Sequence, residues 1–396
     1  MIAFEEAYKK ILEHPLNLGD ESLELMKSMG RILSENILAD RDFPPFNRST
    51  KDGIGINFSA LEKGITRFKV EGVLSAGMPQ QTLSSDKNCL EIMTGAVLPK
   101  NADTIIMYEE TVIENGFATI SQTPNKGQNI HTRGSDKEAG EILLERGTRI
   151  TAAVIGVLAS VGKTKVQVKK LPKVCVVSTG NELVEVSETP LPHQIRKSNS
   201  LSLTAALSKQ NIVPTRLHLP DDKALIEKEL KKALLEHDVL MLSGGVSKGK
   251  FDFIPDALEA LGIEKIFHRV AQRPGKPFWF GIHKQQKKIV FSFPGNPVST
   301  FANYHVYFLP WLAKSLGIAL EKRTVILDEP VQSHPALTLF LQVKTEWREG
   351  QLCAKLVQGN GSGDLVSLAQ ADGFVQVPAG TEILPEETIL KFVPVA

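Results

Sequence analysis

The stretch from residue 171 to 320 limits the fold more than any other part of the chain, because strand-like and helix-like segments alternate along it. Three apolar runs have strand length and end in glycine or small polar residues: KVCVVSTG, DVLMLSGG and KKIVFSFPG. Two stretches of helical length are interleaved with them: LSLTAALSKQ and DKALIEKELKKALLEH. This alternation predicts a parallel sheet covered by helices on both faces, which is a three-layer α/β/α domain.

The sequence on either side of this region has different patterns of apolar and polar residues. Residues 1–40 contain two stretches with apolar residues at helical spacing, and TAAVIGVLASVG predicts a buried helix. Alternating runs between Gly, Pro and Asn turns predict small β-rich domains. We therefore predict four domains: a mixed helical N-terminal domain (1–41 plus 126–170), an inserted β-rich domain (42–125), the α/β domain (171–320) and a C-terminal β-domain (321–396).

Charge and cysteine usage exclude several classes of protein. The formal net charge of +1 argues against general nucleic-acid binding. The three cysteines lie far apart and form no CxxC pair, which favours a reducing compartment over a disulfide framework or a structural zinc site. The N-terminus lacks the apolar core of a signal peptide, and the most apolar stretch, ITAAVIGVLASVG, is too short to span a bilayer. We expect a cytoplasmic protein with no membrane segment.

The ends of the three predicted strands are candidate binding loops, because ligands of open parallel sheets bind beyond the carboxyl ends of the strands. Glu182 lies just past the first strand. Gly244 and Gly245 end the second strand and allow a ligand to approach backbone N–H groups. Pro294 and Pro297 bracket the turn after the third strand, before a predicted helix start. One such loop is typical of an ordinary turn, but three in one sheet favour a ligand site.

Cationic residues lie near these predicted strand ends. Arg269, Arg273 and Lys276 surround a proline-stiffened turn. Ser198 and Asn199 are placed to cap a predicted helix, whose N-terminus attracts anions. By themselves such residues are equally typical of a solvated basic face. Their position beside the glycine loops predicts an anionic ligand, either a phosphate or an oxyanion.

Carboxylates occur in the same loops, at Glu182, Asp221 and Asp252. Each alone is typical of a cap or a surface charge, and Asp221 is placed to cap the helix that follows it. Beside the cationic cluster they predict a Mg²⁺ ion shared with phosphate oxygens. The sequence contains no GxxxxGK[ST], GxGxxG, HExxH or GxSxG motif, which disfavours ordinary ATPases, dinucleotide enzymes, zinc peptidases and serine hydrolases.

Seven segments resemble, in order and spacing, motifs of the molybdopterin molybdenumtransferase family, which includes a homologous domain of gephyrin: DFPPFNRSTKDG, IMTGAVLPKNAD, GQNIHTRGSDKEAG, VVSTGNEL, SGGVSKG, RPGKPFWFG and SFPGNPVS. The resemblance extends along almost the whole chain. It implies a four-domain enzyme that inserts molybdenum from molybdate into adenylated molybdopterin and releases AMP. It also implies a homodimer whose active clefts each use the partner's inserted domain, and contact with other proteins of molybdenum cofactor biosynthesis.

The resemblance assigns roles to individual residues. It implies catalytic roles for Asp52, Thr94, Asp136, Glu182 and Asp252. It implies Mg²⁺ binding by some of Asp221, Asp252 and Glu182. With the residues at the strand ends, the expected contacts to substrate are Ser198, Gly244, Gly245, Arg269, Arg273, Lys276, Pro294, Pro297 and Ser362. Without the resemblance, Thr94 and Ser362 would be read as residues that hydrogen-bond within turns.

The chain departs from the family pattern at several of these loops. The differing residues are Lys51, Ile54, Asn181, Lys197, Lys250 and Gln342, and arginines replace the usual lysines at 269 and 273. Gln342 stands where the family has an arginine thought to hold molybdate, with Lys344 on the same strand face. We expect a more positive cleft than usual. Two alternatives stay open: a non-catalytic molybdopterin-binding paralogue or scaffold, and a molybdopterin adenylyltransferase, whose single sheet domain fits the full-length match less well.

Overall fold

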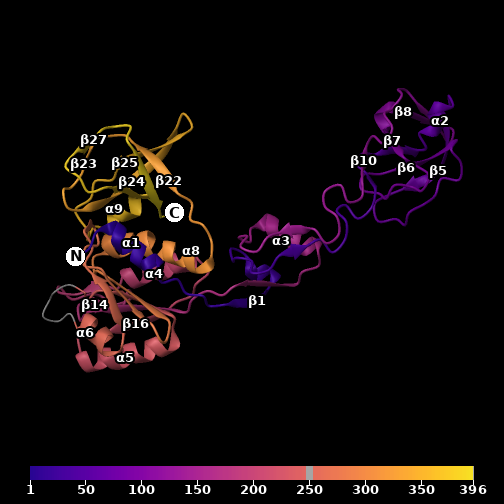
Figure 1. Cartoon of the computed structure of the whole chain (residues 1–396). Coiled ribbons are helices and arrows are strands. Elements are labelled where there is room, and N and C mark those ends of the chain that lie inside the picture. Colours follow the sequence, from indigo (N-terminus) through magenta and orange to yellow (C-terminus); the bar gives the residue numbers. More distant parts are fainter. Residues whose placement is uncertain (247–252, 396) are drawn as a thin grey trace. The chain divides into compact units, whose positions relative to one another are not determined.

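The computed structural model describes residues 1–246 and 253–395, which pack as two units (Figure 1). The first unit comprises Met1–Ser22, Gly30–Ile32 and Gln167–Ala396, and the second comprises Leu23–Met29 and Leu33–Val166. The four-domain boundaries expected from the sequence divide the chain more finely than these units and stay a prediction. In the described residues, no helix has the length and apolar character that crossing a membrane requires.

A six-stranded sheet with the order β16-β13-β17-β21-β20-β18 forms the centre of the first unit. Its strands are β13 (Val174–Thr179), β16 (Thr215–Leu219), β17 (Val239–Ser243), β18 (Glu264–His268), β20 (Trp279–His283) and β21 (Lys288–Phe293). The first four strands in this order are parallel, as predicted. The sequence did not predict β20 and β18, which pair antiparallel at one edge. Only 284–287 join β20 to β21, and so short a link permits a hairpin but no parallel crossover.

Helices cover both faces of this sheet, as predicted (Figure 1). One face carries α1 (Phe4–Leu12), α4 (Asn199–Ser208), α7 (Pro297–Asn303) and α8 (Leu309–Leu316), and the other carries α5 (Lys223–Glu236) and α6 (Ile254–Ala260). Along β13, Val174 and Val176 pack into the first core, whereas Cys175 and Val177 pack into the second. The period-2 alternation of strand side chains therefore fills two cores, which is why the strand is apolar throughout.

The first predicted helix is α1, and it packs in the first unit rather than with 126–170. Its apolar side chains belong to the same core as α8, and the Trp311 Nε1 donates to the His14 carbonyl at 2.8 Å. The prediction of a second helix was wrong. Asp20–Glu24 form the strand β1, and Leu25–Ser28 form a 3-10 turn. Burial alternates along β1 with a period of two, and this short-range alternation prevailed over the few helically spaced leucines.

Between α7 and α8 the chain forms a π-helical segment, Tyr304–Phe308, whose residues are all buried. The long helix predicted after the third strand is therefore interrupted by a wider turn. Such turns are often found at functional sites.

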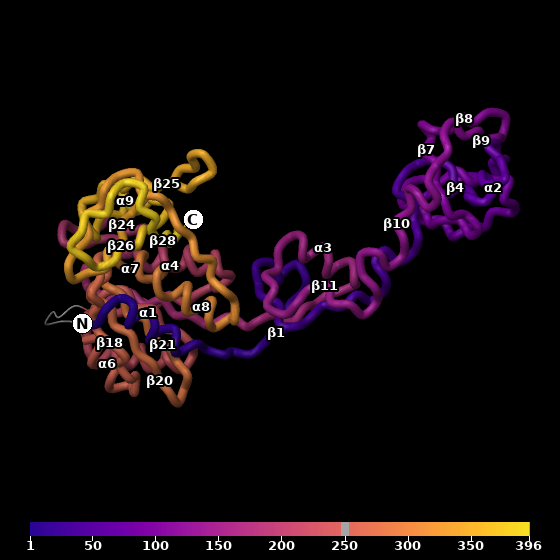
Figure 2. The backbone as a smooth tube through the Cα atoms, turned by 45° about the horizontal axis from the view of Figure 1, so that its top comes forward, coloured from indigo at the N-terminus to yellow at the C-terminus, as the bar shows by residue number. Residues whose placement is uncertain are grey.

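The C-terminal strands of the first unit close into a barrel, because β24 pairs with β26 as well as with β25. The strands are β22 (Arg323–Leu327), β24 (Thr338–Arg348), β25 (Gln351–Leu356), β26 (Gly373–Val377) and β28 (Ile389–Pro394), with the helix α9 (Leu365–Gln370) and the small pair β23 (Val331–Gln332) and β27 (Ile383–Leu384) beside them. A short strand from the sheet domain, β19 (Gln272–Arg273), pairs parallel with β24. Phe340 and Phe374 share a core with Tyr307, and Figure 2 shows the barrel beside α7.

The second unit contains its own six-stranded sheet, in the order β7-β4-β6-β5-β9-β8. The strands are β4 (Gly53–Ile56), β5 (Arg67–Leu74), β6 (Asn88–Ile92), β7 (Thr104–Met107), β8 (Thr111–Glu114) and β9 (Phe117–Ile120), with the helix α2 (Ser59–Glu62) and the 3-10 turn Tyr108–Glu110. Two short pairs follow: β3 (Arg48–Ser49) with β10 (Ile130–His131), and β2 (Ile37–Leu38) with β11 (Ile142–Leu144). These strands confirm the predicted β-rich character of this segment.

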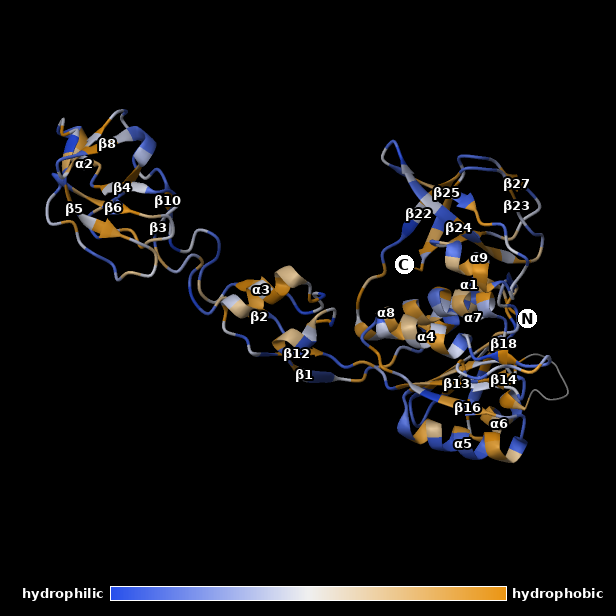
Figure 3. Ribbon diagram, turned by 180° about the vertical axis from the view of Figure 1, so that it is seen from behind, coloured by the Kyte–Doolittle hydropathy of each residue, from blue (hydrophilic) through white to orange (hydrophobic). Residues whose placement is uncertain are grey.

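The apolar helix predicted in this part of the chain is α3 (Ala152–Ser160), which precedes the strand β12 (Lys165–Lys169). Thr151 caps α3 by accepting a hydrogen bond from the Val154 N–H. The hydropathy colouring of α3 shows that it is largely apolar (Figure 3). The expectation that α3 is buried was wrong for the single chain, in which Leu158 is its one buried residue.

Candidate active site

The loops after β17 and β21 meet at the carboxyl end of the sheet in the first unit. The Gly244 N–H donates to the Phe293 carbonyl at 3.2 Å. Asn199, the first residue of α4, donates its side-chain amide to Ser243 Oγ at 2.8 Å and to the Gly295 carbonyl at 2.6 Å. One amide thus ties two strand ends to the start of a helix. The structure therefore brings together two of the three strand ends that the sequence predicts as binding loops.

Gly244 and Gly245 occupy positions that exclude a side chain. Both have positive φ, +99° and +69°, a conformation that glycine adopts without strain. A Cβ on Gly244 would lie 2.8 Å from Thr179 Oγ1, and one on Gly245 would lie 2.6 Å from Ile254 Cγ1. The loop therefore runs directly over the end of β13. Beneath it, the Thr179 hydroxyl is buried and has no hydrogen-bond partner among the described residues.

The third strand end, after β13, is fixed by a reciprocal pair of hydrogen bonds. The Asn181 N–H donates to Asp221 Oδ2 at 3.3 Å, and the Asp221 N–H donates to Asn181 Oδ1 at 3.2 Å. The reading of Asp221 as the cap of α5 was wrong, because Asp222 accepts the Leu225 N–H at 2.9 Å instead. Asp221 is therefore held beside the loop of Glu182, after neighbouring strands β13 and β16.

These acids do not by themselves form a metal site. In the described ranges, which omit 247–252, no group of three or more acidic, histidine or cysteine side chains is placed to hold a metal ion. Asp252, the third expected ligand, and Lys250 lie outside the described residues. Lys197 is paired with Glu185 at 2.6 Å, and its ammonium lowers the pKa of that carboxyl. The ammonium group of Lys197 is therefore engaged in an ion pair.

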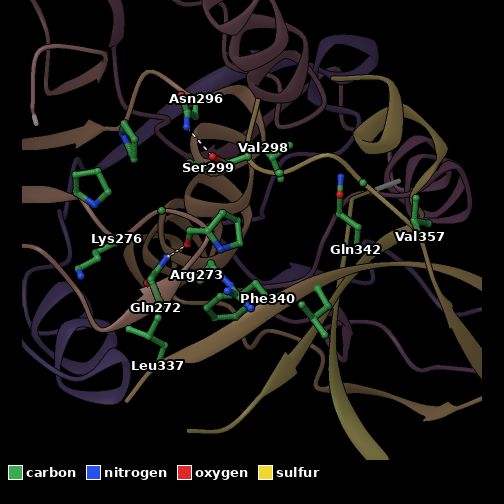
Figure 4. Close-up of a pocket in the computed structure, with 18 of the residues that line it drawn as sticks. Gln272, Arg273, Lys276, Asn296, Val298, Ser299, Leu337, Phe340, Gln342 and Val357 are labelled. Atoms are coloured by element: carbon green, nitrogen blue, oxygen red, sulfur yellow. Dashed lines mark hydrogen bonds between the residues drawn. The ribbon is translucent and has the colours of Figure 1, made fainter. Parts of the chain in front are cut away.

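A pocket of about 680 Å³ lies between the β19 loop, the turn after β21 and the barrel (Figure 4). Four of the expected substrate contacts line it: Arg273, Lys276, Pro294 and Ser362. Arg273 and Lys276 are exposed, and neither forms an ion pair with another described residue. Two unpaired cations facing one cavity favour an anionic occupant.

The turn Pro294–Pro297 links this pocket to the strand ends. Gly295 accepts the Asn199 amide, while Asn296 Nδ2 donates to Ser362 Oγ at 2.6 Å on the other side of the turn. The Val298 N–H also donates to the Ser362 carbonyl at 3.0 Å. The pocket and the glycine loop are therefore neighbours joined by one turn.

Gln342 lines the pocket with an unused donor. Its Oε1 accepts a hydrogen bond from Ser367 Oγ at 3.2 Å, whereas its Nε2 is buried and has no partner in the described chain. Lys344 lies on the same strand face but pairs with Asp372 at 2.7 Å and does not line the pocket. The charge of Lys344 therefore does not replace the arginine that the resemblance leads one to expect at 342.

Five expected contacts are absent from the pocket lining: Ser198, Gly244, Gly245, Arg269 and Pro297. Arg269 has a φ of +72°, and its Nε is buried without a partner among the described residues. A non-glycine residue in this region is strained, and such strain is concentrated at functional sites. Ser198 occupies the N-cap position of α4, but its side chain makes no capping hydrogen bond, contrary to the expected cap.

In the second unit, the structure brings Asp52 and Thr94 together. Asp52 Oδ1 accepts hydrogen bonds from the Thr94 N–H at 2.6 Å and from its hydroxyl at 2.7 Å. These bonds, the backbone one first, lower the pKa of Asp52. Tyr108 donates its backbone N–H to the Asp52 carbonyl and its hydroxyl to Glu91. Burial, followed by the Glu91 carboxylate, raises the pKa of the Tyr108 hydroxyl.

Asp136, the third expected residue of this unit, belongs to a separate chain of hydrogen bonds. Arg48 Nη2 lies 3.2 Å from His131 Nδ1, and His131 Nε2 lies 2.9 Å from Asp136 Oδ1. A guanidinium can only donate, so His131 accepts at Nδ1 and donates from Nε2 to Asp136. Arg48 and His131 could not be predicted from the sequence, because their alignment depends on the pairing of β3 with β10.

Family models match three consecutive segments of the chain. Models described as "MoeA N-terminal region (domain I and II)", "Probable molybdopterin binding domain" and "MoeA C-terminal region (domain IV)" match residues 2–162, 175–314 and 324–394. The molybdopterin molybdenumtransferase of Synechocystis is 38% identical over 382 residues, which cover 96% of both chains. The chain belongs to the molybdopterin molybdenumtransferase family.

Other members of the molybdopterin molybdenumtransferase family support this assignment. The enzyme of that name from Haemophilus influenzae is 36% identical over 320 residues, covering 80% of this chain and 78% of its own. Two crystal structures of the molybdopterin biosynthesis MoeA protein from Pyrococcus horikoshii match with TM-scores of 0.83 and 0.84, at 32% and 26% identity. They cover 100% of this chain and 99% and 100% of their own. The predicted family and fold class, and the role in molybdenum cofactor biosynthesis, are confirmed.

Within this family, the present chain keeps some expected site residues together and alters the surroundings of others. Arg273, Lys276, Pro294 and Ser362 share one pocket, and Asp52 contacts Thr94. Sequence reasoning missed Asn199 as the residue that joins the strand ends. Its signal was present in the motif Ser-Asn at a predicted helix start, but we read that motif as a cap.

Proposed function

We propose that this molybdopterin molybdenumtransferase transfers molybdenum from molybdate to adenylated molybdopterin and releases AMP. The observation that supports it most directly is the pocket in which Arg273 and Lys276 are exposed and unpaired among the described residues. Molybdate is a dianion, so two adjacent cations match its charge. Their position next to the strand ends favours a second anionic group, the phosphate of the adenylated pterin, at the glycine loop.

The strand ends supply the phosphate-binding half of the proposed site. Gly244 and Gly245 bring backbone close to the end of β13, and the turn Pro294–Pro297 precedes α7. The Gly244 N–H is bonded to the Phe293 carbonyl, so Gly244 shapes the loop and the Gly245 N–H is the backbone donor proposed for the phosphate oxygens. Ser198 and Arg269 are proposed to contact the same substrate farther from the pocket.

Mg²⁺ is proposed to bind at Glu182 and Asp221, with Asp252 as the third ligand. The donor set fits the ion in part: carboxylate oxygens are what a hard cation prefers, and Mg²⁺ usually keeps several waters beside one or two carboxylates. Asp221 is already oriented by Asn181. When bound, Mg²⁺ would neutralise charge on the phosphate linkage. The chain's own residues would hold the pterin and molybdate close together, which accounts for most of the expected rate increase.

The second unit is proposed to complete the cleft of a partner subunit in a cytoplasmic homodimer. Asp52, held ionised by Thr94, and Asp136, oriented by His131, are the residues it would contribute. Contact with other enzymes of cofactor biosynthesis is also proposed, because adenylated molybdopterin must be received from the enzyme that makes it.

The deciding experiment follows AMP and reconstituted cofactor after the purified protein is mixed with adenylated molybdopterin, Mg²⁺ and molybdate. We expect one AMP for each molybdenum inserted. Binding of the pterin without AMP release would instead favour a non-catalytic scaffold. Consumption of ATP with free molybdopterin would favour an adenylyltransferase.

A further inference from the structure

The loop that carries Arg273 and Lys276 is buried on its other side. All four residues Gln272, Arg273, Gly275 and Lys276 contribute to the pocket lining, but Arg273 and Lys276 are exposed whereas Gln272 and Gly275 are buried. The cations thus project from one side of the loop, and the opposite side is packed against the helix end at Asn303. The proposed function gives no role to the residues behind the loop.

Three buried polar side chains hold this loop from behind. Gln272 Nε2 donates to the Pro274 carbonyl at 2.9 Å (Figure 4). The same nitrogen donates to Asn303 Oδ1 at 2.8 Å. Asn303 Nδ2 donates to the Gly275 carbonyl at 3.4 Å, and the Tyr307 hydroxyl donates to Gln272 Oε1. Gln272 is 1% exposed, and Asn303 and Tyr307 are fully buried. In this buried environment a hydrogen bond is electrostatically stronger than it is in water, so these bonds favour one position of the loop.

The backbone of the loop at Gly275 lies close to the side-chain amides of Gln272 and Asn303. Gly275 has a φ of +89°, and a Cβ there would lie 2.8 Å from Gln272 Nε2 and closer still to Asn303 Oδ1. Asn303 is the last residue of α7, and Tyr307 belongs to the π-helical segment that follows. The irregular helix thus supplies both residues that hold the loop, which is the kind of position where π-helical turns recur.

We propose that Asn303, acting with Gln272 and Tyr307, is a positioning residue that holds the loop of Arg273 and Lys276 in the geometry for oxyanion binding. The proposal rests on the proposed function in one respect, which is that molybdate binds to these two cations. A fixed backbone leaves each long cation fewer conformations to lose on binding. Without the buried amides, the loop would still carry the same charge but would present it in many arrangements.

Two variants and a matched control test this proposal. Tyr307→Phe removes only the hydroxyl that orients Gln272, and Asn303→Ala removes the amide itself. The control is Tyr304→Phe in the same π-helical segment, because the Tyr304 hydroxyl is buried and has no hydrogen-bond partner among the described residues. Binding of molybdate to the full-length protein is measured by calorimetry, and the thermal midpoint reports folding. Half-saturating concentrations of molybdate and of adenylated molybdopterin are measured separately from AMP release.

We expect molybdate to bind about threefold more weakly to Tyr307→Phe and about tenfold more weakly to Asn303→Ala, as for other residues behind a binding shell. Half-saturation by the pterin and AMP release at saturating molybdate should stay near the unaltered values, and Tyr304→Phe should bind molybdate normally. If Asn303→Ala does not fold, Tyr307→Phe decides. Unchanged molybdate binding in a folded Tyr307→Phe protein would overturn the proposal.

Arg273→Ala separates this proposal from the proposed function. If Arg273→Ala loses molybdate binding while Tyr307→Phe and Asn303→Ala keep it, the positioning role is wrong and the anion pocket stands. If Arg273→Ala binds molybdate as tightly as the unaltered protein, the anion pocket itself is wrong.

Discussion

The side-chain amide of Asn199 donates to the Gly295 carbonyl at 2.6 Å, across 96 residues of sequence. The same nitrogen donates to Ser243 Oγ at 2.8 Å. A residue at a helix start therefore fixes the relative position of two loops that each follow a parallel strand. The proposed phosphate site depends on this contact, because Gly244 and Gly295 lie on those two loops.

Asn199→Ala should weaken both the fold and the reaction. Removing the amide leaves the Gly295 carbonyl and Ser243 without this donor, which is expected to cost about 1–3 kcal/mol in the free energy of unfolding. AMP release should fall more than stability alone explains, because the two loops lose their common anchor. Urea denaturation and the AMP assay check the two effects. Ser208→Ala, at the far end of α4, is the control and should change neither.

Gly244→Ala should damage substrate binding through sterics. The added Cβ would lie 2.8 Å from Thr179 Oγ1 at a φ of +99°, so the loop must shift away from the strand end. Strain of this kind is expected to cost about 1–3 kcal/mol. Gly317→Ala is the matched control, since Gly317 has a φ of +71° but open space around it. Equal loss of adenylated molybdopterin binding in both variants would contradict a specific role of the Gly244 loop.

Gln342 offers a test of how the pocket binds its anion. Gln342→Arg places a third cation where a buried amide now has no partner in the described residues. We expect molybdate to bind about tenfold more tightly, which corresponds to about 1.4 kcal/mol, with a steeper dependence on salt. Titrations at low and high ionic strength measure both. Lys344→Gln serves as the control, because Lys344 pairs with Asp372 and does not line the pocket. Unchanged affinity in Gln342→Arg would place the anion elsewhere.

Thr94→Val tests the second unit. Without the Thr94 hydroxyl, Asp52 loses one of the two bonds that lower its pKa, and its carboxylate is oriented by the Thr94 N–H alone. We expect AMP release to slow by about tenfold while molybdate binding at Arg273 is retained, because positioning of reacting groups is lost without loss of anion affinity. Single-turnover AMP release and calorimetry distinguish these effects. Thr119→Val, an exposed position on β9, should leave both unchanged.

His305 should make the stability of the protein depend on pH. Burial lowers the pKa of His305 from 6.5 to about 4, although its bond to the Phe301 carbonyl acts in the opposite direction. As pH falls below about 6.5, the unfolded chain takes up a proton that the folded chain refuses until about pH 4. The free energy of unfolding should therefore fall across this window, by about 3 kcal/mol at most.

Denaturation at pH 7.5 and at pH 5 measures this effect. In His305→Gln the loss of stability between these two pH values should be smaller than in the unaltered protein. The same loss in both proteins would assign the pH dependence to other groups.

The local pattern of the sequence was sufficient for the elements around the site. Fully apolar runs predicted β13, β17 and β21 correctly, because a strand that is buried on both faces of a sheet has no solvent-facing side that requires polar residues. The glycines after β13 and β17 marked loops correctly, because Gly180, Gly244 and Gly245 have positive φ, which glycine adopts without strain. The segment 20–28 was mistaken for a helix because a few apolar residues fit both periods.

By itself, the sequence determined the family, the fold class and the identity of the loops, since each depends on residue type and order along the chain. Only the tertiary structure decided which side chains meet: Asn199 with Gly295, Asn303 with the cation loop, and Ser367 with Gln342. The physical reason is that a hydrogen bond acts over about 3 Å in space, whatever the sequence separation of its partners. Such pairs become visible only once the strands and helices that carry them are packed.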